Sequence, residues 1–184
     1  MRIVAGTLAM MLLTGCAERL ATAPAEPPAA AVPATLAPAP PQLRETPVLD
    51  GFTQCVPLAR ALSGIEIYGD AWTWWGQAAG RFQRDRTPRV GSVLALQRSD
   101  RLRLGHVGVV AAVAGPRELH LTHANWGGDS DMRGLVHERQ PVIDVSPGND
   151  WSQLRFMNRF GQYGRVYAAH GFIHPQPPTS LVSR

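Results

Sequence analysis

A stretch rich in proline and alanine limits how much of this chain can fold into a packed domain. Eight of the 16 prolines of the 184-residue chain lie between residues 17 and 48, together with ten alanines. Because such a segment offers few large apolar side chains to bury, it is predicted to form an extended, semi-rigid spacer. We therefore expect a single globular domain over residues 49–184, a length that one hydrophobic core can hold together.

The residues before the spacer have the features of an export signal. Arg2 gives a positive start, and the apolar run over residues 3–13 is shorter than the roughly 20 residues that span a bilayer. The run ends in Leu13-Thr14-Gly15-Cys16, which resembles the bacterial lipobox, in which the cysteine is lipidated after cleavage. An ordinary signal peptide with a cysteine near its end is the alternative.

The lipobox interpretation predicts three parts of the chain. They are a lipoprotein signal peptide over residues 1–15, a lipidated Cys16 with a linker over residues 16–48, and the folded domain over residues 49–184. We expect an exported lipoprotein, anchored by lipid to a membrane and facing the periplasm. Ala17, where an acidic residue would favour the inner membrane, points to the outer membrane.

The composition excludes several kinds of chemistry. All 18 basic residues are arginine, which excludes mechanisms that need a lysine, such as a Schiff base or a Ser–Lys dyad. The two cysteines, Cys16 and Cys55, are too few for a disulfide scaffold or a cysteine-rich zinc site. The net charge is +4, and the arginines of residues 81–89 could attract anionic glycan or lipid headgroups, although a solvated loop is the simpler interpretation. Nucleic acid is not expected as a partner of an exported protein.

The hydrophobic periodicity of the predicted domain changes from helical to strand-like. Helical spacing predicts a helix from Cys55 to Leu62, with Pro57 in its first turn and a stop at Gly64. Asp70 is the expected N-cap of a second helix over residues 71–79. A period of two then predicts strands over residues 90–97, 106–113 and 118–125, and weaker ones over 142–145, 166–169 and 171–173. Helices followed by an antiparallel meander indicate an α+β fold.

Cys55 is the main candidate for a nucleophile. It stands at the predicted helix start, where free backbone N–H groups and the helix dipole favour a thiolate. A lone cysteine is often inert core packing. Outside the cytoplasm, however, an unpaired thiol is exposed to oxidation. If Cys16 is lipidated, Cys55 has no disulfide partner in the chain.

Three polar residues on strands are candidates for the partners of this thiol. Strand alternation places Leu119, Leu121, His123 and Asn125 on one inward face, so His123 and Asn125 need hydrogen-bond partners. If the two strands pair, His106 can approach both. A nucleophile, a base and an orienting group in hydrogen-bonding sequence form a catalytic triad, whereas a structural role for His106 is the alternative.

Four segments of the chain stand in an order typical of one family. They are Gln54-Cys55-Val56, Pro88-Arg89-Val90-Gly91-Ser92-Val93, Gly105-His106-Val107-Gly108-Val109-Val110 and His123-Ala124-Asn125-Trp126. Together they resemble the CHAP domain, the cysteine, histidine-dependent amidohydrolase/peptidase, over roughly Gly51 to Ile173. The resemblance implies a papain-like fold, with N-terminal helices packed on an antiparallel β-sheet, and hydrolysis of amide bonds in peptidoglycan.

The resemblance also implies roles for single residues. Cys55 would be the nucleophile and His106 the general base and acid. Many members have Glu-x-Asn in the third strand, where this chain has His123 and Asn125, so either residue could orient His106. The backbone N–H of Cys55 is expected in the oxyanion hole, with Gln54 as a second donor or merely a helix cap. Trp126 could line the cleft or belong to the core.

No cofactor and no metal ion are expected. Residues 129–134 begin like a calcium loop, but Arg133 stands where an oxygen ligand belongs and Gln140 where the closing glutamate belongs. The acidic cluster that some CHAP domains have before the nucleophile is reduced to Asp50.

Three functions remain open at this point. The first is a monomeric hydrolase of peptidoglycan stem or cross-bridge peptides, acting as an endopeptidase or an N-acetylmuramoyl-L-alanine amidase. The second is a catalytically weak cell-wall-binding or scaffold lipoprotein with the same fold, favoured by the departure at His123 and the lack of a separate wall-targeting module. The third is amide hydrolysis or synthesis on a substrate outside the wall, such as a peptide conjugate.

Overall fold

The computed structural model describes residues 53–127 and 132–175. The signal peptide, Cys16, the linker over residues 16–48, Asp50 and the start of the rejected calcium loop lie outside the described residues. The described elements are α1 (Cys55–Ser63), the 3₁₀ helix η1 (Ala71–Thr73), α2 (Trp74–Gln77), β1 (Arg84–Asp85), β2 (Val93–Leu96), β3 (His106–Gly115), β4 (Glu118–Ala124), β5 (Val136–Asp144), β6 (Gln153–Met157) and β7 (Tyr163–Ile173). None of the described helices is long and apolar enough to cross a membrane.

The helix α1 begins and ends where the sequence predicts. Pro57, which has no N–H to donate, lies in the first turn, where helical N–H groups have no partner in any case. The helix ends before Gly64, whose left-handed φ of 74° lets its N–H donate to the carbonyl of Arg60. The second predicted helix is shorter than expected, because residues 71–79 form only one 3₁₀ turn and the four-residue α2.

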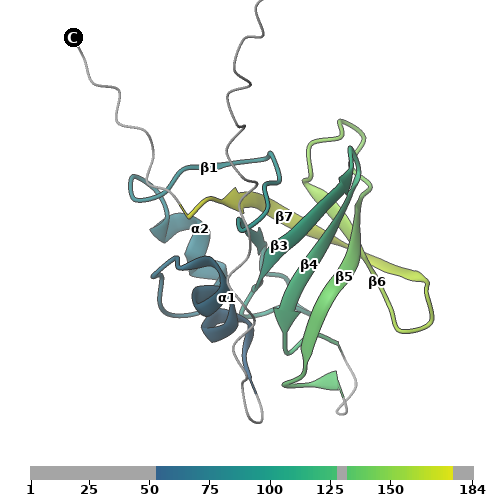
Figure 1. Cartoon of the computed structure of the whole chain (residues 1–184), viewed down its shortest axis with the longest axis horizontal. Helices are drawn as coiled ribbons and strands as arrows, with labels where there is room; N and C mark the ends of the chain where they lie inside the picture. Colours follow the sequence, from purple (N-terminus) through teal and green to yellow (C-terminus); the bar gives the residue numbers. More distant parts are fainter. Residues whose placement is uncertain (1–52, 128–131, 176–184) are drawn as a thin grey trace, which may run out of the picture. The chain divides into compact units, whose positions relative to one another are not determined.

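The strands form one antiparallel sheet that closes on itself. The order is β1-β7-β2-β3-β4-β5-β6, and β6 pairs in addition with β7. Closure is possible because β7 is long: its first half pairs with β6, for example Leu154 with Tyr167, and its second half pairs with β2, for example Val93 with Ile173. In Figure 1, β3, β4 and β5 lie side by side, and β7 crosses behind them towards β6.

The observed fold is therefore mixed, with mostly strands and few helices. The expectation of an α+β chain with helices first holds in this coarse form. The expected antiparallel meander is present from β2 to β7, but the sheet also closes into a barrel-like form and contains β6, neither of which the sequence indicated.

Alternation along the central strands creates two separate cores. On β2, Val93 and Ala95 pack with α1, whereas Leu94 and Leu96 face the barrel interior. The first core contains Leu58, Ala59, Leu62, Trp74, Val107 and Val109, and the second contains Val110, Leu119, Leu121, Leu154, Phe156 and Phe172. Because β2 and the start of β3 are covered on both faces, the helix that carries Cys55 is fixed against the strand that carries His106.

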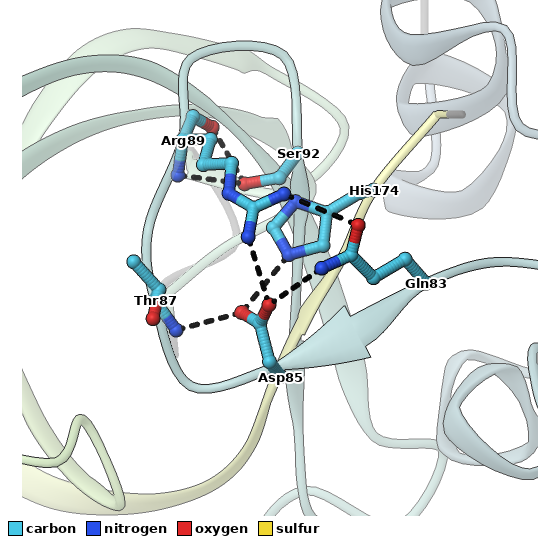
Figure 2. A network of polar contacts seen from close by, with 6 residues as sticks. All are labelled: Gln83, Asp85, Thr87, Arg89, Ser92 and His174. Atoms are coloured by element: carbon cyan, nitrogen blue, oxygen red, sulfur yellow. Dashed lines mark hydrogen bonds and ion pairs between the residues drawn. The ribbon is translucent and has the colours of Figure 1, made fainter. Parts of the chain in front are cut away.

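The short strand β1 is held to the end of β7 by a polar network around Asp85 (Figure 2). The two carboxylate oxygens of Asp85 accept hydrogen bonds from His174, Arg89, Gln83 and the backbone N–H of Thr87. These contacts hold the pKa of Asp85 below its ordinary value, although its partial burial acts in the opposite direction. The network ties the edge of the sheet to the turn that leads into β2.

The arginines of residues 81–89 are used inside the domain. Each contacts another group: Arg81 donates to the carbonyl of Glu66, Arg84 to the carbonyl of Trp75, Arg86 pairs with Asp150, and Arg89 pairs with Asp85. The cluster thus cross-links neighbouring segments and does not form a free basic surface.

Candidate active site

Cys55 is the first residue of α1, and its sulfur lies beside the start of β3. The backbone N–H groups of Val107, Val56 and Cys55 itself face the sulfur and favour the thiolate. Burial outweighs these donors and raises the pKa of the thiol above its ordinary value. Since Val107 directly follows His106, the thiol stands next to the residue predicted to be its base.

His106 and His123 are brought together on adjacent strands. Nε2 of His106 and Nδ1 of His123 are 2.7 Å apart, within hydrogen-bonding distance, and both rings are buried. The pairing of β3 with β4 places His123 across from Gly108. A Cβ atom at Gly108 would lie 2.9 Å from the Cβ of His123, so the glycine leaves the space that the imidazole occupies.

Hydrogen bonds connect His123 further to Gln140 on β5. Nε2 of His123 hydrogen-bonds to Oε1 of Gln140, and Nε2 of Gln140 donates to the carbonyl of Met157, at 2.6 Å. The ring of His137, which pairs with His123 across β4 and β5, lies 5.4 Å from the His123 ring. Nε2 of His137 is buried and has no hydrogen-bond partner among the described residues.

Both histidines of the pair favour the neutral form. Burial lowers the pKa of His106 well below its ordinary value, and the neighbouring His123 and His137 lower it further. Burial also lowers the pKa of His123 to about 3, against the opposing effect of its hydrogen bond to Gln140. With the raised pKa of Cys55, these shifts make a neutral thiol and a neutral imidazole the resting state near pH 7.

Asn125 does not share the inward face with His123, contrary to the alternation expected from the sequence. It follows the last residue of β4 with a φ of 57°, so the strand pattern ends before it. Its Oδ1 accepts a hydrogen bond from the N–H of Gly134, and its Nδ2 donates to Oε1 of Gln54 at 2.7 Å. The structure thus brings Asn125 to Gln54 and not to His106.

Gln54 occupies the N-cap position of α1 but makes no side-chain capping hydrogen bond. Because its Oε1 is taken by Asn125, its Nε2 remains as a donor. A cleft of about 790 Å³ is lined by Gln54, Cys55, His106 and Asn125, together with Arg101 and Arg103. Four of the six residues expected in the site therefore border one cleft.

Comparison with known protein families finds a match over the part of the chain that contains these residues. The family model of the CHAP domain matches residues 48–125. The chain contains a CHAP domain. The matched range includes Cys55, His106, His123 and Asn125. No curated protein matches the chain.

The CHAP domain is typical of a family of amidases and peptidases that hydrolyse peptidoglycan. The match ends at Asn125, so His137 and Gln140 lie beyond it. Sequence reasoning missed both residues because residues 136–141 were not expected to form a strand. A β5 extended back to Val136 would have placed His137 opposite His123.

Trp126 packs on the imidazoles of the CHAP domain and does not line the cleft that contains Cys55. Its ring centroid lies 4.6 Å from that of His106 and 4.5 Å from that of Phe156. It lines a neighbouring cavity of about 590 Å³, which also borders His137 and Gln140. Trp126 therefore packs against both rings of the histidine pair from the side of this second cavity.

The described part of this CHAP domain offers no site for a metal ion. Within residues 53–127 and 132–175, no three His, Cys, Asp or Glu side chains are arranged to hold one.

Proposed function

We propose that the chain is a cysteine-dependent amide hydrolase that acts on peptidoglycan. The scissile bond would lie in a stem or cross-bridge peptide, for an endopeptidase, or between muramic acid and L-alanine, for an N-acetylmuramoyl-L-alanine amidase. The observation that carries the proposal is that Cys55 and His106 line one cleft, while His106 is hydrogen-bonded to the buried His123. The CHAP match supports the same class of substrate.

In the proposed reaction, Nδ1 of His106 takes the proton from the Cys55 thiol as the sulfur attacks the carbonyl carbon of the amide. The backbone N–H of Cys55 and Nε2 of Gln54 are the donors available for the oxyanion of the tetrahedral intermediate. His106 then gives the proton to the leaving amine, and the C–N bond breaks to leave a thioester on Cys55. Water, deprotonated by His106, hydrolyses the thioester and restores the thiol.

The test is cleavage of purified peptidoglycan, with products resolved by mass spectrometry. Cys55→Ala is expected to abolish cleavage without unfolding the domain, because removing the sulfur leaves only a small cavity. His106→Ala is expected to do nearly the same, because an unassisted thiol is only a few per cent ionised near pH 7. Circular dichroism of both variants serves as the control for folding. Intact wall in every wild-type digest would contradict the proposal.

A second function is a catalytically weak wall-binding or scaffold lipoprotein. The raised pKa of Cys55 and the neutral His123 in place of an acidic residue favour it, since neither stabilises a thiolate in the resting protein. Alkylation by iodoacetamide separates the two functions. An active site is expected to react fast near pH 7, whereas slow alkylation combined with intact wall would support the scaffold.

We also propose that the chain is an exported, lipid-anchored monomer on the periplasmic side of the outer membrane. The lipobox-like sequence before Cys16 and the residue Ala17 support this location.

A further inference from the structure

Hydrogen bonds link the candidate base His106 through His123 and Gln140 to a backbone carbonyl, which can act only as an acceptor. The backbone carbonyl of Met157 can only accept a hydrogen bond, so the group of Gln140 that faces it at 2.6 Å must be the amide nitrogen. The other end of the same amide, Oε1, then faces Nε2 of His123. An amide oxygen can only accept, and therefore Nε2 of His123 carries a proton.

The proton on Nε2 of His123 also fixes the tautomer of His106. With a proton on Nε2 and its pKa near 3, His123 is neutral at pH 7, and its Nδ1 is an acceptor. Nε2 of His106, 2.7 Å away, must then be the donor. In neutral His106 the lone pair is left on Nδ1, the nitrogen that does not face His123.

We propose that Gln140 is a positioning residue that sets the tautomers of His123 and His106, so that neutral His106 presents an unprotonated Nδ1 as the base for Cys55. The inference rests on the proposed function for its catalytic consequence, but the tautomers themselves do not depend on catalysis. Without the amide, His123 can carry its proton on Nδ1 instead. That tautomer would either break the pair or force the proton of His106 from Nε2 to Nδ1, and in both cases the unprotonated Nδ1 of His106 would no longer be fixed.

The surroundings explain why an amide suits this position better than a carboxylate. His137 from β5 lowers the pKa of both rings, Cys55 from α1 lines the same cleft as His106, and no carboxylate among the described residues shifts the pKa of either ring. Tyr167 from β7 lies behind Trp126, 4.9 Å between ring centroids, and Glu138 and Arg139 on β5 are exposed. A neutral amide accepts from His123 without adding charge that would favour a protonated ring.

The decisive measurement is the tautomeric state of the histidines in the full-length protein, by long-range ¹H–¹⁵N NMR of ¹⁵N-histidine. In the wild type we expect both His106 and His123 as neutral Nε2–H tautomers at pH 7. In Gln140→Leu we expect His123 to lose this single tautomer. The matched control is Gln97→Leu, because Nε2 of Gln97 likewise donates to a strand carbonyl, that of Ala169 at 3.1 Å, whereas its side chain lies outside the His106–His123 pair. Unchanged tautomers in Gln140→Leu, or equal changes in both variants, would overturn the inference.

Gln140→Glu provides a second test that does not depend on the folding of the leucine variant. The carboxylate still accepts from Nε2–H of His123, but its charge should raise the pKa of His123 by about 1–3 units. The ¹⁵N shifts report this titration directly. A pKa of His123 that is unchanged in Gln140→Glu would show that the side chain does not act on the ring.

The rate of wall cleavage connects the tautomers to catalysis. We expect Gln140→Leu to lower kcat/KM for wall cleavage on the order of 10- to 100-fold, with kcat carrying the loss, while Gln97→Leu stays near the wild type. If the tautomers shift as expected but wild-type protein leaves the wall intact, the proposed function fails and the positioning role stands. If the wild type cleaves the wall and Gln140→Leu cleaves it equally well, the positioning role fails.

Discussion

At the scale of single residues, the pairing of the two histidines depends on a missing side chain. Gly108 lies on β3, two residues after His106, and a Cβ atom there would lie 2.6 Å from Cδ2 of Leu121 and 2.9 Å from Cβ of His123. Real Cβ contacts of that length do not occur in packed interiors, so His123 or Leu121 would have to move.

Gly108→Ala is therefore expected to lower the free energy of unfolding by about 1–3 kcal/mol and to reduce wall cleavage strongly. Chemical denaturation and the cleavage assay measure the two effects. Gly115→Ala is the matched control, because Gly115 ends the same strand and a Cβ there meets nothing within 4 Å. Equal stability and activity of the two variants would show that the close approach at Gly108 is unimportant.

His123 and Asn125 are expected to contribute differently to the rate. His123 contacts His106, and by analogy with triad orienters its replacement by alanine should cost on the order of 10²–10⁴ in kcat/KM. Asn125→Ala should cost less, since the side chain of Asn125 contacts Gln54 and Gly134 but not His106. Steady-state kinetics on a soluble muropeptide measures both. The reverse order would make Asn125 the orienting residue.

At the scale of elements, the carboxylate of Asp85 adds side-chain contacts to the backbone pairing of β1 with β7 (Figure 2). Asp85 accepts hydrogen bonds from four groups, and one of them, His174, is buried. Asp85→Asn replaces one acceptor oxygen with a donor and leaves some of these partners unsatisfied. We expect a loss of about 1–3 kcal/mol in the free energy of unfolding, measured in urea.

The same variant should leave the alkylation rate of Cys55 unchanged, because Asp85 does not line the cleft. Asp100→Asn is the control for stability alone, since Asp100 is exposed and outside the network but borders the cleft. A destabilisation no larger than that of Asp100→Asn would mean that the network adds nothing to the stability of the sheet.

The elements also show what the sequence could and could not predict. The helix at Cys55 and the strands that carry His106 and His123 have clear periodicity, and the structure contains all three. Residues 137–140 are polar and Pro141 follows them, so their pattern does not indicate a strand. Sheet closure depends on the pairing of β6 with distant β7, which no local pattern encodes. Gln140 was missed as a partner of His123 for this reason.

At the scale of the whole molecule, the buried histidines couple stability to acidity. An unfolded histidine has a pKa near 6.5. Burial lowers the pKa of His123 to about 3 in the folded protein, and that of His106 well below its ordinary value. Between these values the unfolded chain binds more protons than the folded one, so stability must fall as the pH decreases.

We expect the free energy of unfolding to fall as the pH is lowered from about 6.5 towards 4.5, by up to about 1.4 kcal/mol per pH unit for each of the two histidines. His170, whose pKa is also lowered, acts in the same direction. The carboxylates with lowered pKa, Asp85 and Asp150, lose their contribution only below about pH 4. Urea midpoints at several pH values measure the slope, and His123→Leu should flatten it. A constant midpoint between pH 6.5 and 4.5 would contradict the neutral, buried pair.

The predicted lipid anchor would limit how far the folded domain reaches from the membrane. If lipid on Cys16 anchors the chain, a linker over residues 17–48 with about 3.1 Å per residue places the domain on the order of 100 Å from the membrane at most. An anchored hydrolase can then act only on the wall layer within that distance. Metabolic labelling with a palmitate analogue should mark the wild type, and Cys16→Ser should remove the label and release the protein from the membrane fraction. Limited proteolysis should trim the chain to about residue 49 and leave the domain folded, with its Cys55 alkylation rate unchanged. If the wild-type protein takes up no label, the prediction of a lipid anchor is wrong. If the trimmed domain unfolds, the domain begins before residue 49.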